Sequence, residues 1–191
     1  CIAAKRFLVE RPVVEAFTAA FADRMARRVV GDPRDPRTEL GPLARPDLVD
    51  TLDRQVRESV AGGARIVTGG ARPARAGCFY PPTVLDRVEP GMAAFDEETF
   101  GPLAPVTVAR DAEHAVALAN RSRFGLGASV WSRDAARAEA IARRLEAGAV
   151  FVNGIVKSDP RLPFGGIKRS GYGRELSAAG IREFVNLKTV W

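Results

Sequence analysis

The sequence predicts an α/β fold in which helices cover a doubly wound, mostly parallel β-sheet. Short apolar stretches rich in β-branched residues alternate with segments whose apolar residues recur at helical spacing. Helix-length segments between strands are typical of parallel sheets, because a parallel pair needs a long crossover. Hydrophobic residues make up 46% of the 191 residues and charged residues 27%, as in a globular domain. We see no repeat and no linker that would divide the chain.

The first half of the chain opens with strand and helix patterns. Residues 5–10 (KRFLVE) alternate as a strand does, and residues 13–30 carry apolar side chains at helical spacing. The turn-rich stretch GDPRDPRTELGP then leads into a second helix at residues 46–61. A short strand at residues 64–68 ends at two glycines, and an extended strand at residues 79–87 is interrupted by two prolines.

The second half continues the alternation. The helix predicted at residues 135–147 should end at Gly148 in the left-handed conformation that glycine adopts readily. The last strand, residues 185–191, is apolar and β-branched and has no obvious partner, so it either completes its own sheet or pairs with another subunit. The other predicted elements are strands at 103–109, 126–131 and 149–153 and helices at 112–120 and 177–184.

Composition excludes several classes of protein. The net charge is +6, but the arginines are dispersed among alanines and acids, which argues against nucleic-acid binding. No apolar run approaches the roughly 20 residues that cross a membrane. Two cysteines, Cys1 and Cys78, make no disulfide framework and predict the reducing cytoplasm. The single histidine, His114, excludes a metal site built on several histidines.

Three segments carry candidate chemistry. Cys1 is either a small buried hydrophobe cut from a longer context or an N-terminal nucleophile with its own amine as base. Glu98 and Phe100 flank a threonine before a Gly-Pro corner, where a carboxylate can bind a diol and a ring can pack on a planar group. Residues 163–175 hold four glycines in nine residues, which supply positive φ and close backbone approach, yet match no dinucleotide fingerprint.

Together and in this order, these segments resemble the aldehyde dehydrogenase superfamily. The matching segments are the cysteine before AAKRFLV, EETFGP, FGL, VN and PFGGIKRSGYGRE, so the likeness covers essentially the whole chain. AAKRF and SDPRLPFGG are most similar to succinate-semialdehyde dehydrogenases. The resemblance implies a catalytic domain over residues 1–168, a return segment and C-terminal oligomerisation strand over residues 169–191, and a cofactor-binding domain upstream of this chain.

The resemblance also implies roles for individual residues. Cys1 would be the catalytic nucleophile, Glu98 would bind the nicotinamide ribose of NAD or NADP, and Phe100 would lie near the nicotinamide. Glu175 would relay protons to a general base, or serve only as an acid at a helix N-terminus.

Two further residues are implied on the substrate side. Phe164 would line the aldehyde tunnel or pack in the core. Ser158 would bind the succinate carboxylate or be a loop serine without a role, and Lys157 and Arg161 are weaker candidates for attracting an acidic substrate.

The implied reaction is oxidation of an aldehyde, succinic semialdehyde by this likeness, through a thiohemiacetal and a thioester on the cysteine. We expect a small-molecule substrate, no nucleic acid, no membrane, no metal and a homodimer or homotetramer. The alternative is a catalytically inert, truncated fragment that folds and self-associates, and we expect this chain alone to be inactive.

Overall fold

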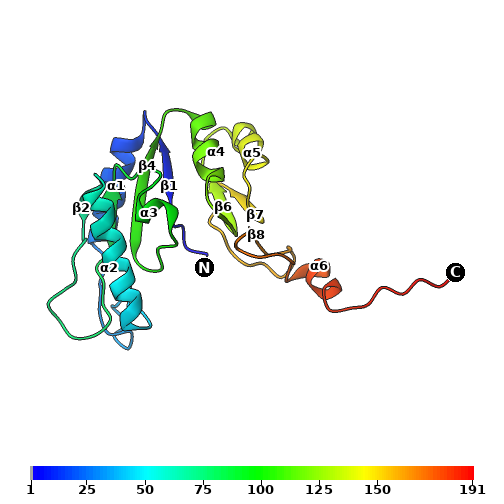
Figure 1. Ribbon diagram of the computed structural model, residues 1–191, viewed down its shortest axis with the longest axis horizontal. Helices are drawn as coiled ribbons and strands as arrows, with labels where there is room; N and C mark the ends of the chain where they lie inside the picture. Colours follow the sequence, from blue (N-terminus) through cyan, green and yellow to red (C-terminus); the bar gives the residue numbers. More distant parts are fainter. Residues whose placement is uncertain (1) are drawn as a thin grey trace. The chain divides into compact units, whose positions relative to one another are not determined.

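The computed structural model describes residues 2–191 (Figure 1), so the predicted nucleophile Cys1 lies outside the described residues. The chain forms two compact units: Lys5–Ala115, and residues 2–4 together with Val116–Trp191. The boundary falls within helix α4 (Ala112–Asn120). No linker composition marks this boundary, because it lies inside a regular helix. The expected division into a catalytic domain to residue 168 and a return segment after it stays a prediction.

The unit Lys5–Ala115 contains a four-stranded mixed sheet, and the structure confirms the predicted α/β class. Its strand order is β1 (Phe7–Glu10), β4 (Leu103–Ala109), β3 (Thr83–Asp86) and β2 (Arg65–Thr68). β1, β4 and β3 are mutually parallel, with Phe7 opposite Val106 and Thr83 opposite Leu103. β2 is antiparallel to β3, so the sheet is mixed rather than wholly parallel.

Helix α1 (Val14–Ala26) packs against this sheet. Its Ala22 joins Val84, Ala104 and Val106 in one buried cluster. Three phenylalanines, Phe7, Phe17 and Phe21, pack around the cluster, and the ring centroids of Phe7 and Phe21 are 4.7 Å apart. Aromatic and β-branched side chains on both elements thus produce the core that holds β1 beside β4.

Helix α2 (Pro46–Ala61) has the predicted bounds and buries Val49, Leu52 and Val56. Pro46 lies in its first turn, where the missing N–H costs no helical hydrogen bond. Helix α3 (Ala93–Asp96) was not predicted, since four residues are too short to show helical periodicity.

The second unit is built around a parallel β–α–β segment. Strand β6 (Gly127–Val130) pairs in parallel with β7 (Ala149–Val152), and α5 (Ala135–Ala142) connects them. Strands β5 (Phe124–Gly125) and β8 (Ile167–Lys168) form a separate antiparallel pair, and α6 (Ser177–Arg182) follows. No helix within residues 2–191 has the length and apolar content to span a bilayer.

The expectation for Gly148 was wrong in two respects. Helix α5 ends at Ala142, before the predicted residue 147, and Gly148 does not have positive φ. A β-carbon at Gly148 would instead lie 1.7 Å from the carbonyl oxygen of Gly165. Glycine is needed here because two backbone segments approach closely, and this requirement is invisible in local sequence.

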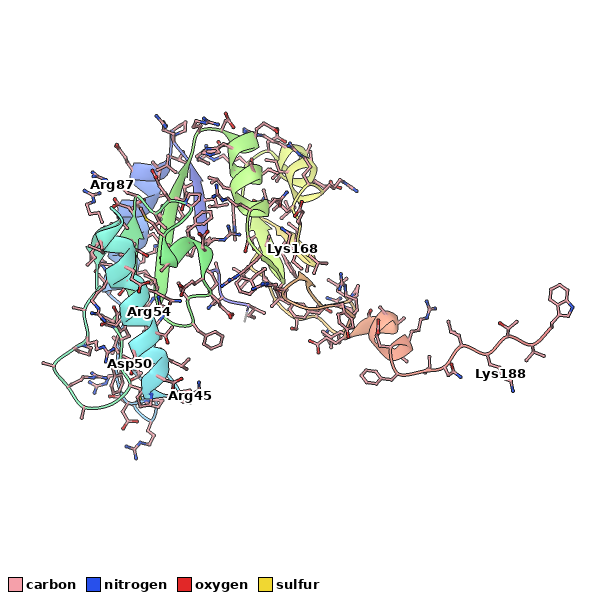
Figure 2. The ribbon with its side chains drawn as sticks, viewed as in Figure 1. Arg45, Asp50, Arg54, Arg87, Lys168 and Lys188 are labelled. Carbon is pink, nitrogen blue, oxygen red and sulfur yellow. The ribbon has the colours of Figure 1, made fainter. Side chains whose placement is uncertain are left out.

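The predicted strand at residues 185–191 is not a strand within the described chain. The segment runs away from the rest of its unit in an extended course (Figure 1), with Leu187 and Trp191 exposed. Lys188 projects from the same extended stretch (Figure 2). The proposal that it pairs with another subunit therefore stays a prediction.

Substituting Leu85 by alanine should destabilise the unit Lys5–Ala115 by about 2–5 kcal/mol, because the side chain is fully buried in an inner strand. Its register partner Ile66 is 41% exposed and provides a matched control, whose change to alanine should cost less than half as much. Urea unfolding followed by circular dichroism measures both, and equal losses would contradict the burial argument.

Candidate active site

The turn at residues 97–101, here called the acid–aromatic turn, connects α3 to β4. Thr99 is fully buried, whereas Glu98 and Phe100 on either side are exposed, Phe100 by 46%. The Gly101 amide donates to the Thr99 carbonyl at 3.1 Å, and the Leu103 amide donates to the Gly101 carbonyl at 2.8 Å. The exposed side chains of Glu98 and Phe100 therefore extend from a backbone that is anchored by these bonds.

Lys5 is a charged neighbour of this turn, on the side of Phe100. Its Nζ lies 5.1 Å from the centroid of the Phe100 ring, within cation–π range. Burial lowers the pKa of Lys5 below its ordinary value of 10.5, and the nearby Glu98 carboxylate partly opposes that shift. The guanidinium of Arg6, the next residue, lies 5.1 Å from the centroid of the Phe95 ring.

The two adjacent glutamates have different surroundings. The Glu97 carboxylate accepts hydrogen bonds from Arg54 at 2.7 Å and from the Gln55 amide at 2.9 Å. Arg54 lies on α2 (Figure 2). Within residues 2–191 no hydrogen bond is made to the Glu98 carboxylate, so its acceptor positions are available to a ligand.

In the other unit, the glycine-rich loop at residues 165–173 is packed backbone against backbone. Gly171 and Gly173 have positive φ, as predicted. The Lys168 ammonium (Figure 2) donates to the Asn120 and Ser122 carbonyls at 2.7 and 3.0 Å, at the C-terminal end of α4, where a cation is favoured. The loop is thereby tied to the end of a helix.

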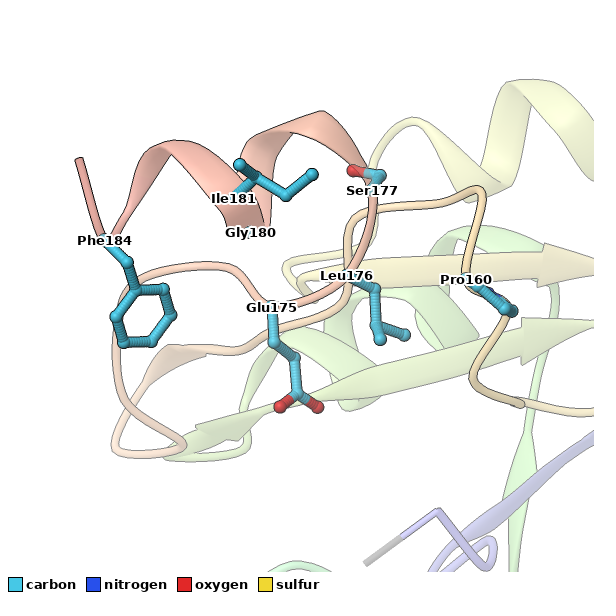
Figure 3. Close-up of a pocket in the computed structure, with 7 residues that line it drawn as sticks. All are labelled: Pro160, Glu175, Leu176, Ser177, Gly180, Ile181 and Phe184. Atoms are coloured by element: carbon cyan, nitrogen blue, oxygen red, sulfur yellow. The ribbon is translucent and has the colours of Figure 1, made fainter.

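Phe164 and Glu175 are brought together across this loop. Each backbone N–H donates to the other residue's carbonyl at 2.8 Å. Glu175 also lines an open pocket of about 430 Å³ (Figure 3). The other lining residues are mostly apolar: Pro160, Leu176, Ser177, Gly180, Ile181 and Phe184. The Glu175 side chain is exposed and points away from α6 (Figure 3).

Ser158 lies on the exposed loop that precedes this pocket. Ser177 holds the loop near α6 through a backbone hydrogen bond from its amide to the Pro160 carbonyl at 3.0 Å. Arg161 is engaged by Asp159, with Nε–Oδ1 and Nη2–Oδ2 distances of 2.9 and 2.7 Å, and these bonds hold the pKa of Asp159 below its usual range. That ion pair weakens Arg161 as a substrate-binding candidate.

The predicted site residues thus fall in two groups, each within one unit. Glu98 and Phe100 share the acid–aromatic turn in one unit. In the other unit, Glu175 lines the pocket beside α6, here called the α6 pocket, Phe164 is bonded to Glu175 through the backbone, and Ser158 precedes the lining residue Pro160 in sequence. Within residues 2–191 no group of three His, Cys, Asp or Glu side chains is arranged to hold a metal ion.

Sequence reasoning missed Lys5 and Gln55. Gln55 has a recognisable signal, because it occupies an apolar position of α2 between Leu52 and Val56, where a polar residue demands a buried partner. Lys5 has no comparable signal, since a lysine at the start of a strand is ordinarily solvated.

The chain belongs to the aldehyde dehydrogenase family, whose model matches residues 1–190. It is 53% identical over all its 191 residues to the NAD(P)+ succinate semialdehyde dehydrogenase Sad of Escherichia coli, and 50% identical to the NADP+ succinate-semialdehyde dehydrogenase 1 of Mycobacterium tuberculosis. It spans 41% and 42% of their lengths.

Solved structures give the same family. The match to the succinate-semialdehyde dehydrogenase of Burkholderia pseudomallei covers 96% of this chain and 38% of that enzyme's chain, with a TM-score of 0.93 and 40% sequence identity. The match to the succinic semialdehyde dehydrogenase of Streptococcus pyogenes, solved with NADP+, covers 97% of this chain and 41% of that enzyme's chain. Its TM-score is 0.94 and the sequence identity is 35%.

Replacing Glu98 by glutamine should lower the pKa of Lys5 further, because the carboxylate that favours the charged ammonium is removed. NMR titration of the Lys5 side chain measures this directly, with Lys188 on the exposed terminal segment as internal reference. An unchanged pKa of Lys5 would contradict the coupling.

The same shift makes stability depend on pH. Between the pKa of Lys5 in the folded chain and its ordinary 10.5, the unfolded chain binds more protons. The contribution of Lys5 to the free energy of unfolding therefore rises with pH between these two pKa values. Glu98→Gln should move the lower limit of this pH range to a lower pH, because it lowers the pKa of Lys5 in the folded chain.

Proposed function

We propose that this chain is the catalytic-domain portion of an NAD(P)-dependent aldehyde dehydrogenase that oxidises succinic semialdehyde to the acid. The observation that carries the proposal is the acid–aromatic turn, which presents an exposed carboxylate and an exposed ring from an anchored backbone. Membership of the family and the likeness to succinate-semialdehyde dehydrogenases support it.

The described residues fit the nicotinamide end of such a cofactor. The Glu98 carboxylate can accept hydrogen bonds from both hydroxyls of a ribose, and the half-exposed Phe100 ring offers an apolar face to a planar group. When bound, NAD(P)+ supplies the acceptor for the hydride. Glu98 and Phe100 would orient it, and neither residue would change its protonation state or form a covalent bond.

Cys1 is proposed as the nucleophile. The pKa of a thiol is ordinarily about 8.5, and the deprotonated thiolate is the form that attacks the aldehyde. Its sulfur forms a bond to the carbonyl carbon, and the carbonyl oxygen gains a proton to complete a thiohemiacetal. Loss of hydride from that carbon and of the hydroxyl proton leaves a thioester. Water then breaks the C–S bond, releasing the acid and the thiol.

Glu175 and Phe164 are proposed on the substrate and proton side of the reaction. The apolar walls of the α6 pocket suit an aliphatic chain, and an exposed carboxylate at its edge can pass protons to solvent. Ser158 is proposed to bind the distal carboxylate of succinic semialdehyde through its hydroxyl. Lys157 is exposed on the same loop and would add a favourable charge.

We further propose that the protein assembles with copies of itself. Six apolar residues near the C-terminus are exposed, and the last segment has no strand partner within the described chain: Ile181, Phe184, Val185, Leu187, Val190 and Trp191. An extended apolar segment of this kind is suited to pairing with a strand of a second subunit.

In the longer enzyme of which this chain is proposed to be the catalytic-domain portion, changing Cys1 to alanine should reduce NAD(P)H formation from succinic semialdehyde at least about a thousandfold, because the covalent step is lost. Cys78→Ala is the matched control and should retain activity within about twofold. Absorbance at the reduced nicotinamide band measures the rate with each cofactor in turn. Equal activity of both variants, or no turnover by the unchanged protein, would favour the inert, self-associating fragment.

In the same longer enzyme, changing Ser158 to alanine should raise the KM for succinic semialdehyde about tenfold or more, because a hydrogen bond to a carboxylate is worth about 1.5–3 kcal/mol. Butanal has the same chain length without the carboxylate, so its KM should change less than about twofold. Steady-state kinetics with both aldehydes separate the effects. A similar rise for both would show that Ser158 supports the loop rather than the carboxylate.

A further inference from the structure

The buried face of α2 carries two polar side chains that reach a different segment of the chain. Gln55 is 1% exposed and Ser59 is fully buried, on the face that also buries Leu52 and Val56. The Ser59 hydroxyl donates to the Gln55 carbonyl at 2.7 Å and accepts from the Ala94 amide at 2.9 Å. Ser59 therefore ties α2 to the start of α3.

Gln55 ties the same helix to the acid–aromatic turn. Its Nε2 donates to the Glu97 carboxylate at 2.9 Å and to the Glu98 backbone carbonyl at 3.1 Å. One side-chain amide thus holds both the residue before Glu98 and the peptide group that follows the Glu98 side chain. These two bonds fix the backbone on both sides of the Glu98 Cα atom, and so restrict the direction in which the Glu98 side chain points.

This arrangement has a cost in stability. The Gln55 Oε1 and the Thr99 hydroxyl are buried, and neither has a hydrogen-bond partner among the described residues. An apolar side chain of similar length at position 55 would avoid burying an unpaired oxygen. It would also leave the Glu98 carbonyl without the hydrogen-bond donor that Gln55 supplies. Gln55 therefore contributes through the two hydrogen bonds that its amide nitrogen donates.

We propose that Gln55 is a positioning residue for the nicotinamide-ribose site. It fixes the turn from behind so that Glu97 is engaged with α2 and the Glu98 carboxylate faces outward. Lys5 acts on the exposed side of the same turn, over the Phe100 ring. This inference rests on the proposed cofactor role of Glu98, and it assigns to Gln55 of α2 a part in holding the turn that carries Glu98.

The test compares Gln55→Met with Ser59→Ala in the full 191-residue chain. Each variant removes buried hydrogen bonds from the same face of α2, but only Gln55 bonds to the turn. Amide hydrogen exchange by NMR should show Gly101 exchanging at least tenfold faster in Gln55→Met. In Ser59→Ala the faster exchange should occur at Ala94, whose donor bond is lost, and Gly101 should change less than twofold.

The functional readout is binding of oxidised nicotinamide mononucleotide, followed through the Phe100 amide signal, with adenosine monophosphate as control ligand. Gln55→Met should weaken binding at least tenfold, whereas Ser59→Ala should stay within twofold. If Gln55→Met does not fold, Gln55→Asn replaces it, since the shorter amide cannot reach both acceptors.

Equal losses of affinity in both variants, or unchanged affinity in Gln55→Met, would overturn the positioning role. A different result is that the unchanged chain binds no mononucleotide while the Gly101 amide still exchanges faster in Gln55→Met. That result would contradict the cofactor role of Glu98. Gln55 would then be a structural brace only, which separates the failure of the proposed function from the failure of the bracing.

Discussion

The parallel pairing of β1 with β4 is the constraint on which the candidate cofactor site depends. Parallel strands begin at the same edge of a sheet, so the residues before β1 and the turn before β4 are brought to one place. Lys5 consequently lies over Phe100, and Arg6 over Phe95. A slip of one residue would exchange the faces of the β1 side chains and remove both contacts.

Burial divides the residues of the acid–aromatic turn into those that hold it and those that can act. Thr99 faces the interior, and Glu97 is held by Arg54 and Gln55. Only Glu98 and Phe100 are left to meet a ligand. Holding the backbone of such a turn before the ligand arrives reduces the ordering that binding would otherwise require.

The glycine-rich loop reaches a similar result by different means. Its backbone packs so closely that a β-carbon at Gly148 would collide with Gly165, and Lys168 ties it to the last carbonyls of α4. Phe164 and Glu175 are then joined by two backbone bonds. Close backbone packing and backbone hydrogen bonds thus hold the loop in place.

The α/β class and the order of the long elements could be predicted from the sequence. The segments proposed to carry the chemistry were also chosen from the sequence alone. The helix at Pro46–Ala61 and the strand at Leu103–Ala109 were predicted to the residue, because periodicity and burial are local patterns. Only the tertiary structure decided that α3, β5 and β8 form, why Gly148 is glycine, and which of two adjacent glutamates is held by its neighbours. Those outcomes depend on partners distant in sequence: Gln55 reaches Glu97 across 42 positions, and Lys168 reaches Asn120 across 48. No local pattern records such a hydrogen bond, since its partner is selected by how the backbone folds.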